Sequence, residues 1–188
     1  MELGRYTEAE SGLLESLRLC KESGNRWGMG TAYRYLGLVK MAQGELEEAK
    51  SLFRTSIETF GDYFFGWDIA KSWVYLGEAV FRSGDLVEAR RAYLEALRLS
   101  KEADASPLML DALTGLAQLS LQSREYEQAF QISLFVVNQS ARTQKTRDWA
   151  DQIVQSAQKC LDDKQVQAMR KSLSDQSLNE IVSALRAG

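Results

Sequence analysis

Residues 73–93 read WVYLGEAVFRSGDLVEARRAY, and residues 33–53 read YRYLGLVKMAQGELEEAKSLF. The two stretches lie forty residues apart and share an aromatic residue, a Leu-Gly pair, a second glycine and an Ala-x3-aromatic ending. Apolar residues recur at spacings of three and four on both sides of the second glycine, which is typical of two helices. The glycine can end the first helix, and the acidic residue after it favours the start of the second. Each stretch therefore predicts a helical hairpin.

The forty-residue register continues without insertion or deletion over four copies. Four alanines keep this register: Ala9, Ala49, Ala89 and Ala129. Four small residues keep it as well: Gly37, Gly77, Ala117 and Ala157. Small residues let two helices approach closely, and hairpins of this kind bury their apolar faces only by stacking on one another. We therefore expect an all-α, right-handed superhelical solenoid of antiparallel helical hairpins.

The periodicity also predicts where the helices lie. We expect long helices over residues 5–22, 28–42, 45–60, 66–82, 85–102, 107–122, 125–139 and 144–161, and short ones near 164–173 and 177–186. Residues 1–162 then form an array of about three and a half to four repeats, the first of them truncated. Residues 163–188 form capping helices, because a solenoid needs a polar terminal cover. The helix over 5–22 lacks a leading partner, so self-association through this N-terminal edge is a further expectation.

Composition narrows the range of partners. The chain has 188 residues, one proline and a net charge of −3. Its basic residues are scattered along the helices and give no strong positive field, so we expect this region to make no nucleic-acid contact. The start, MELGRYTEAE, does not resemble a signal sequence, and no apolar stretch is long enough to cross a membrane. We therefore expect a cytoplasmic chain with no membrane partner, in which Cys20 and Cys160 are free and buried.

The sequence offers little for catalysis or metal binding. It contains no histidine, which removes the commonest metal ligand and the commonest general base. Pairs of carboxylates such as Asp148 and Asp151 are interpreted as solvent-facing charge. We therefore expect no enzyme, no catalytic residue, no metal site and no cofactor.

Aromatic residues are concentrated in GDYFFGWDIAKSWVYLG, residues 61–77. Trp67, Trp73 and Tyr75 lie forty residues after other aromatic residues, so we interpret them as packing of the repeat itself. Three further aromatic residues have no aromatic counterparts in the other copies: Tyr63, Phe64 and Phe65. Two interpretations stay open for these three. They either fill a groove between hairpins or form an accessory contact for a ligand or partner.

The shared pattern resembles the tetratricopeptide repeat (TPR), on the residues Trp73-x2-Leu76-Gly77, Gly84 and Ala89-x3-Tyr93. The chain departs from that family in its period of forty rather than 34 residues, and in Lys40 and Val80 at a position that is usually tyrosine. Segments such as GNRWGMGTAYRYLGLV and VVNQSARTQKTRDWAD are similar to the C-terminal TPR regions of large bacterial signalling proteins with a STAND-type ATPase. This resemblance implies a protein- or peptide-binding scaffold or sensor module; the alternative is a small-molecule effector-sensing domain.

The resemblance also implies a binding surface on the concave face, lined by the first helix of each hairpin. The corresponding residues in this chain are Arg34, Leu38, Met41, Val74, Glu78, Phe81, Thr114, Gln118 and Leu121. Met41, Phe81 and Leu121 form an apolar strip, which suits an amphipathic helix or an extended apolar peptide. The strip could equally pack as ordinary core, and that alternative stays open.

Overall fold

A computed structural model describes residues 2–61 and 66–172 of the chain, and these residues form α-helices and no strand. The helices are α1 (Glu2–Glu22), α2 (Arg26–Gln43), α3 (Leu46–Phe60), α4 (Gly66–Arg82), α5 (Leu86–Glu102), α6 (Ser106–Gln122), α7 (Tyr126–Asn138), α8 (Gln144–Gln158) and α9 (Asp163–Ser172). The predicted fold class, an all-α helical repeat built from consecutive hairpins, is confirmed. The helix expected at 177–186 lies outside the described residues.

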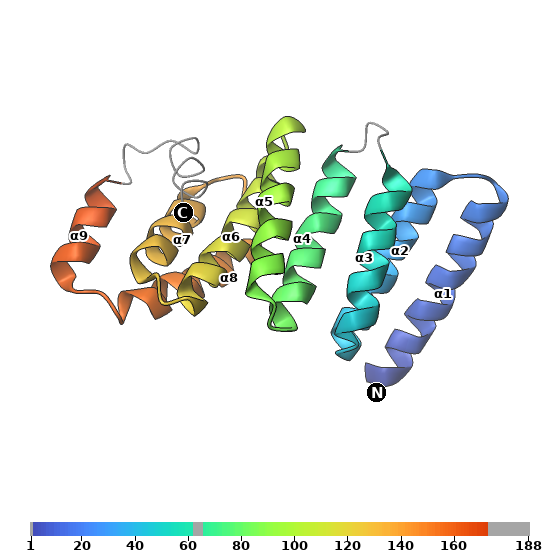
Figure 1. Cartoon of the computed structure of the whole chain (residues 1–188), viewed down its shortest axis with the longest axis horizontal. Coiled ribbons are helices and arrows are strands. Elements are labelled where there is room, and N and C mark those ends of the chain that lie inside the picture. The colour runs from blue at the N-terminus through green and yellow to red at the C-terminus, as the bar shows by residue number, and fades with distance from the viewer. Residues whose placement is uncertain (1, 62–65, 173–188) are drawn as a thin grey trace. The chain divides into compact units, whose positions relative to one another are not determined.

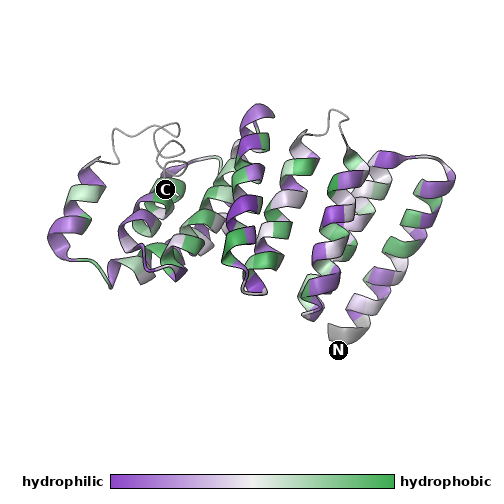
Figure 2. Cartoon of the chain, viewed as in Figure 1, coloured by the Kyte–Doolittle hydropathy of each residue, from purple (hydrophilic) through white to green (hydrophobic). Residues whose placement is uncertain are grey.

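The helices gather into two compact units, Met1–Ala112 and Leu113–Gly188. In the first unit each helix packs on the next one along the chain, from α1 to α5, and neighbouring helices run in opposite directions (Figure 1). In the second unit α7 packs on α8 and contacts α9. Most helices carry one hydrophobic and one hydrophilic side, as Figure 2 shows. The handedness of the superhelix and the boundary at 162/163 stay predictions.

The turns inside the hairpins follow the forty-residue register. Gly44 and Gly84 end α2 and α4 in the left-handed conformation, with φ of 83° and 91°. Arg124, which replaces glycine in the fourth copy, adopts the same conformation with φ of 65°. After Gly84, the carboxylate of Asp85 accepts a hydrogen bond of 2.9 Å from the backbone N–H of Glu88, which confirms the predicted cap of α5. The left-handed conformation therefore recurs at this position of the hairpin even where the residue is not glycine.

The exception is the first copy, in which the glycine of the register lies inside a helix. The helix expected over 5–22 begins at Glu2, so α1 includes Gly4. At this position the first copy therefore departs from the turn that the register predicts.

Each hairpin of the first unit closes on a contact between a glycine and an aromatic ring. A Cβ atom at Gly37 would lie 2.6 Å from Cε1 of Phe53, and one at Gly77 would lie 2.8 Å from Cδ1 of Tyr93. Both rings are almost completely buried. A glycine is required because any larger side chain would occupy the volume of the ring.

We expect Gly77→Ala to lower the free energy of unfolding by about 1–3 kcal/mol, because the added methyl group overpacks the contact with Tyr93. Gly12→Ala is the matched control, since Gly12 lies within α1 and has no atom within 4 Å of an added Cβ. There the gain in helix propensity should raise stability by about 0.5–1 kcal/mol. Urea unfolding of the two variants measures both effects, and two changes of the same sign would contradict this account of the contact.

The ring of Tyr93 also carries a buried hydroxyl group. Its oxygen has no hydrogen-bond partner among the described residues, and burial raises the pKa of this tyrosine well above its usual range. The equivalent residue one repeat earlier is Phe53, which lacks the hydroxyl group.

We expect Tyr93→Phe to keep the packing and to remove a buried group that is not hydrogen-bonded, which raises the free energy of unfolding by about 1 kcal/mol. Thermal or urea unfolding measures the change. A loss of stability would show that the hydroxyl group has a stabilising partner.

In the described part of the second unit, α9 packs against α7. Val166 and Met169 of α9 are buried, and the guanidinium of Arg170 lies 5.5 Å from the ring centroid of Phe130. The side-chain amide of Gln165 donates a hydrogen bond of 2.7 Å to Glu127 of α7. These contacts attach the amphipathic α9 to the apolar side of α7, and the capping role of 163–188 stays a prediction.

Candidate functional site

One face of α2 and the equivalent face of α4 carry the most exposed aromatic residues of the first unit. Spacings of four, four, three and four residues keep five side chains of each helix on one side. We call this surface the first-helix face; its residues are Trp27, Thr31, Tyr35, Leu38 and Ala42 on α2, and Trp67, Lys71, Tyr75, Glu78 and Arg82 on α4. Trp27, Tyr35 and Trp67 are 47%, 45% and 44% exposed.

A buried ion pair lies directly beneath the first-helix face. Arg34 of α2 is 3% exposed and donates hydrogen bonds to the carboxylate of Asp68, at 2.8 Å, and to its backbone carbonyl, at 3.1 Å. The indole N–H of Trp27 donates to the other carboxylate oxygen at 3.0 Å. The guanidinium also lies 5.6 Å from the ring centroid of Phe60. Charge-assisted bonds therefore hold Trp27 and the first turn of α4 in place.

Buried hydroxyl groups extend this polar contact to α3. The hydroxyl of Ser72 donates to the carbonyl of Asp68 at 3.0 Å, and that of Ser56 donates to the carbonyl of Gly30 at 2.8 Å. The two hydroxyl oxygens lie 3.0 Å apart. Polar contacts therefore connect α2, α3 and α4 inside an otherwise apolar interior.

We expect Asp68→Ala to lower the free energy of unfolding by about 3–5 kcal/mol, because it leaves the buried Arg34 cation without its partner. The double variant Arg34→Met/Asp68→Ala should recover a large part of that loss, since it removes both charges. Chemical denaturation of the two single variants and the double variant measures this coupling. Strictly additive losses would contradict the assignment of Asp68 as the partner of Arg34.

On α4 a lysine lies beside the exposed tryptophan of the first-helix face, and a partly buried tyrosine lies one turn further along. The ammonium of Lys71 lies 4.5 Å from the ring centroid of Trp67. Burial lowers the pKa of Lys71, the Arg34 cation acts in the same direction, and Asp68 and Asp111 oppose them. Burial likewise raises the pKa of Tyr75, and Asp111 adds to that shift. The first-helix face thus combines exposed aromatic rings with a partly desolvated lysine.

The structure places the nine sequence-predicted binding residues at different depths. Four of them are buried: Arg34, Met41, Val74 and Thr114. Five are half-buried: Leu38, Glu78, Phe81, Gln118 and Leu121. In the second unit the amide oxygen of Gln118 accepts a hydrogen bond of 3.2 Å from the indole of Trp149. The binding role of the nine residues stays a prediction, and in the first unit its accessible members are Leu38, Glu78 and Phe81.

The sequence interpretation missed the exposed aromatic residues of this face. Trp67 was interpreted as packing of the repeat itself, but 44% of its surface is exposed, so packing accounts for only part of the side chain. Trp73 and Tyr75 are half-buried. Counting back from Leu38 in steps of three and four would have found Tyr35 and Trp27 on the same side. The proposed accessory contact at Tyr63, Phe64 and Phe65 lies outside the described residues.

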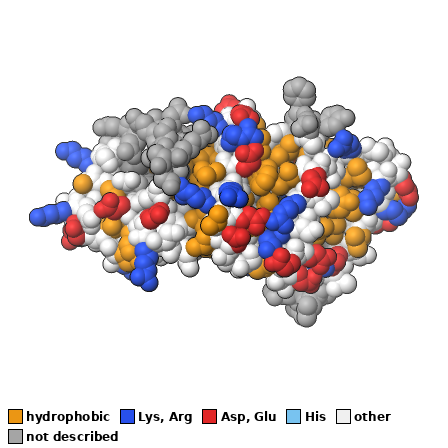
Figure 3. Space-filling model, in the orientation of Figure 1, with side chains coloured by type: hydrophobic (Ala, Val, Ile, Leu, Met, Phe, Trp, Pro, Cys, Tyr) orange, Lys and Arg blue, Asp and Glu red, His pale blue; other side chains and the backbone are white. Residues whose placement is uncertain are grey.

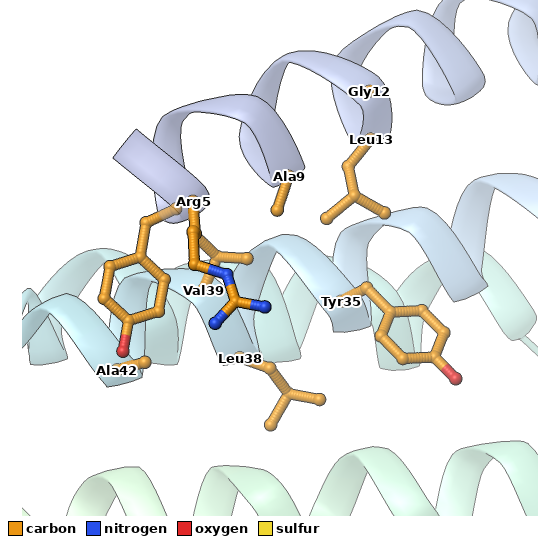
Figure 4. Close-up of a pocket in the computed structure, with 9 residues that line it drawn as sticks. Arg5, Ala9, Gly12, Leu13, Tyr35, Leu38, Val39 and Ala42 are labelled. Atoms are coloured by element: carbon orange, nitrogen blue, oxygen red, sulfur yellow. The ribbon is translucent and has the colours of Figure 1, made fainter. Parts of the chain in front are cut away.

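A second feature of the first unit is a groove of about 650 Å³ between α1 and α2. It is lined by Arg5, Tyr6, Ala9, Gly12, Leu13, Tyr35, Leu38, Val39 and Ala42. Figure 4 shows Arg5, Ala9 and Leu13 projecting from α1 toward α2. Its walls are mainly apolar, and Tyr35, Leu38 and Ala42 also belong to the first-helix face.

The structure also bears on metal binding, in the parts of the chain that it describes. Over these residues, no group of three or more cysteines and carboxylates is placed to hold a metal ion. Cys20 is half-buried, and Cys160 is exposed, so the expectation that Cys160 is buried is wrong. Acidic and basic side chains are interspersed on the face seen in Figure 3. Within the described helices, none is long and apolar enough to cross a membrane.

Residues 68–133 match the model of the tetratricopeptide repeat family. The match covers most of α4, all of α5 and α6 and most of α7, and it supports the expected assignment to this family. No curated protein matches the chain. Repeats of this family generally serve as scaffolds for protein–protein interaction, and the helical fold they form is typically not catalytic.

Proposed function

We propose that this chain is a peptide-binding module that takes an extended apolar or aromatic segment of a partner protein on its first-helix face. The observation that carries the proposal is the repetition of exposed tryptophans, Trp27 and Trp67, at equivalent positions of consecutive hairpins. Large aromatic residues that are half exposed on a fixed backbone supply much of the energy at protein interfaces.

The surroundings of these rings support the same proposal. Arg34 and Asp68 fix Trp27 before any partner arrives, so binding orders fewer side chains. Lys71 and Glu78 place one cation and one carboxylate beside the apolar residues. A peptide with large apolar side chains and both kinds of charge fits this surface better than a strongly charged tail does.

The test begins with a displayed library of random twelve-residue peptides selected on the immobilised chain. Peptides rich in aromatic and aliphatic residues should be enriched, and Trp67→Ala should weaken their binding about tenfold or more. Val87→Ala is the control, because Val87 is 67% exposed on α5 and lies outside the first-helix face. Isothermal titration calorimetry gives the dissociation constants, and circular dichroism checks that each variant is folded.

Selected peptides that bind wild type and the Trp67 variant equally would overturn the assignment of the face. The alternative is a small-molecule sensor, and it is tested by measuring the melting temperature of the chain with each member of a metabolite panel. Stabilisation by one metabolite, lost in the same variant, would favour that alternative.

We further propose that the module is the sensor end of a larger bacterial signalling protein with a STAND-type ATPase, of the kind its sequence resembles. The support is the resemblance over segments such as GNRWGMGTAYRYLGLV. The coding sequence upstream of this region tests the proposal. A phosphate-binding G-x4-G-K-[ST] loop encoded in the same reading frame would support it, and a different or absent upstream domain would contradict it.

A further inference from the structure

Lys71 differs from the other half-buried lysines in the described part of the chain, which are Lys40 and Lys50. Lys40 pairs with the carboxylate of Glu10 at 2.9 Å, and Lys50 pairs with that of Glu47 at 2.6 Å. The ammonium of Lys71 instead lies 4.5 Å from the centroid of an indole ring and forms no ion pair among the described residues. A half-buried cation is therefore left without the partner that its counterparts have.

The charges around Lys71 do not replace this missing partner. Burial lowers the pKa of Lys71, and the Arg34 cation acts in the same direction. Asp68 and Asp111 oppose this shift, but neither of these described residues forms an ion pair with Lys71. The carboxylate of Asp68 accepts hydrogen bonds from Arg34 and from the indole of Trp27, so it is already occupied. The charge of Lys71 is therefore only partly compensated within the described chain.

The repeat itself does not require a lysine at this position. The residues that share the register of Lys71 are Thr31 and Asp111. All three positions are helical, in α2, α4 and α6. Because the helices accept a hydroxyl group, an ammonium and a carboxylate there, the lysine of α4 points to a contact made outside the hairpin.

Lys71 lies between two aromatic residues on the same side of α4. Trp67 precedes it by four residues and Tyr75 follows it by four, so each step is about 6 Å along the helix axis. In an extended peptide, side chains that face the same way are two residues apart, which is about 6.6 Å. A peptide that lies along α4 therefore brings three alternate side chains to Trp67, Lys71 and Tyr75.

We propose that Lys71 is the specificity-determining residue of the first-helix face and pairs with an Asp or Glu side chain of the bound peptide. The partner segment carries this acid between two large apolar residues, each two positions away. The apolar side chains contact Trp67 and Tyr75, and the carboxylate supplies the partner that the ammonium lacks. Because this role rests on the proposed peptide-binding function, the test below separates the two.

The probe is the tightest-binding peptide from the display selection on the immobilised chain, synthesised with both ends blocked so that its carboxylates belong to side chains. Selected sequences should share an acid that is flanked, two residues away on each side, by large apolar residues. Changing that acid to its amide should weaken binding to the wild-type chain about fivefold in isothermal titration calorimetry. On the variant Lys71→Met the acid and amide peptides should bind equally.

Lys50→Met is the matched control, because Lys50 is also a half-buried lysine but lies on α3, outside the first-helix face. This variant should keep the fivefold preference for the acid. Lys71→Met should melt at the same temperature as the wild-type chain or higher, since it removes a half-buried cation that lacks an ion pair. A purely structural role of Lys71 in holding Trp67 would lower the melting temperature and weaken both peptides alike, and would overturn the proposal.

Selected peptides that lack the acid, or equal binding of the acid and amide peptides to the wild-type chain, would overturn the role of Lys71 and leave peptide binding in place. Failure of the selection, or binding that is unchanged in Trp67→Ala, would overturn both.

The other source of a carboxylate is the C-terminus of a partner chain. The amide peptide with its C-terminus unblocked should stay as weak as the blocked one. If unblocking restores binding to the wild-type chain but not to Lys71→Met, Lys71 pairs with a chain terminus, and the assignment to a side chain is overturned.

Discussion

The hairpins of the first unit depend on the close contact between a glycine of one helix and an aromatic ring of the next. Without a Cβ atom at Gly37 and Gly77, the rings of Phe53 and Tyr93 lie directly against the helix backbone. Close packing then brings the neighbouring alanines, Ala49 and Ala89, to complete burial. Because the contact recurs every forty residues, each hairpin offers the next one the same shape, and the helices stack in sequence order.

Apolar packing alone does not determine the position of one hairpin along the helix axes of the next. The buried ion pair restricts that position. Arg34 and Asp68 join α2 and α4 by hydrogen bonds that are satisfied in one relative position of the two helices. A shift would leave a charge buried without its partner, which costs far more than a shift between apolar surfaces. The same pair orients Trp27, so one interaction sets both the position of α4 and the shape of the first-helix face.

The first-helix face and the groove between α1 and α2 meet on α2. Tyr35 and Leu38 belong to the first-helix face and also line the groove between α1 and α2. Any group that enters the groove would cover part of both side chains. Occupation of the groove would therefore change the surface available to a peptide, which gives the two surfaces a direct physical connection.

The sequence by itself determined the helical class, the hairpin boundaries and the turn conformations. These features follow from local rules: apolar spacing, glycine in the left-handed conformation, and Asp85 as a cap. Only the tertiary structure decided which side chains of the first helices are accessible. Arg34 was predicted to line the binding surface; it is buried because the carboxylate of Asp68 pairs with it, and its binding role stays a prediction. Trp67 was interpreted as packing of the repeat, and it is 44% exposed. How deeply a side chain is buried depends on contacts between helices that are distant in the chain. The periodicity within one helix carries no information about those contacts.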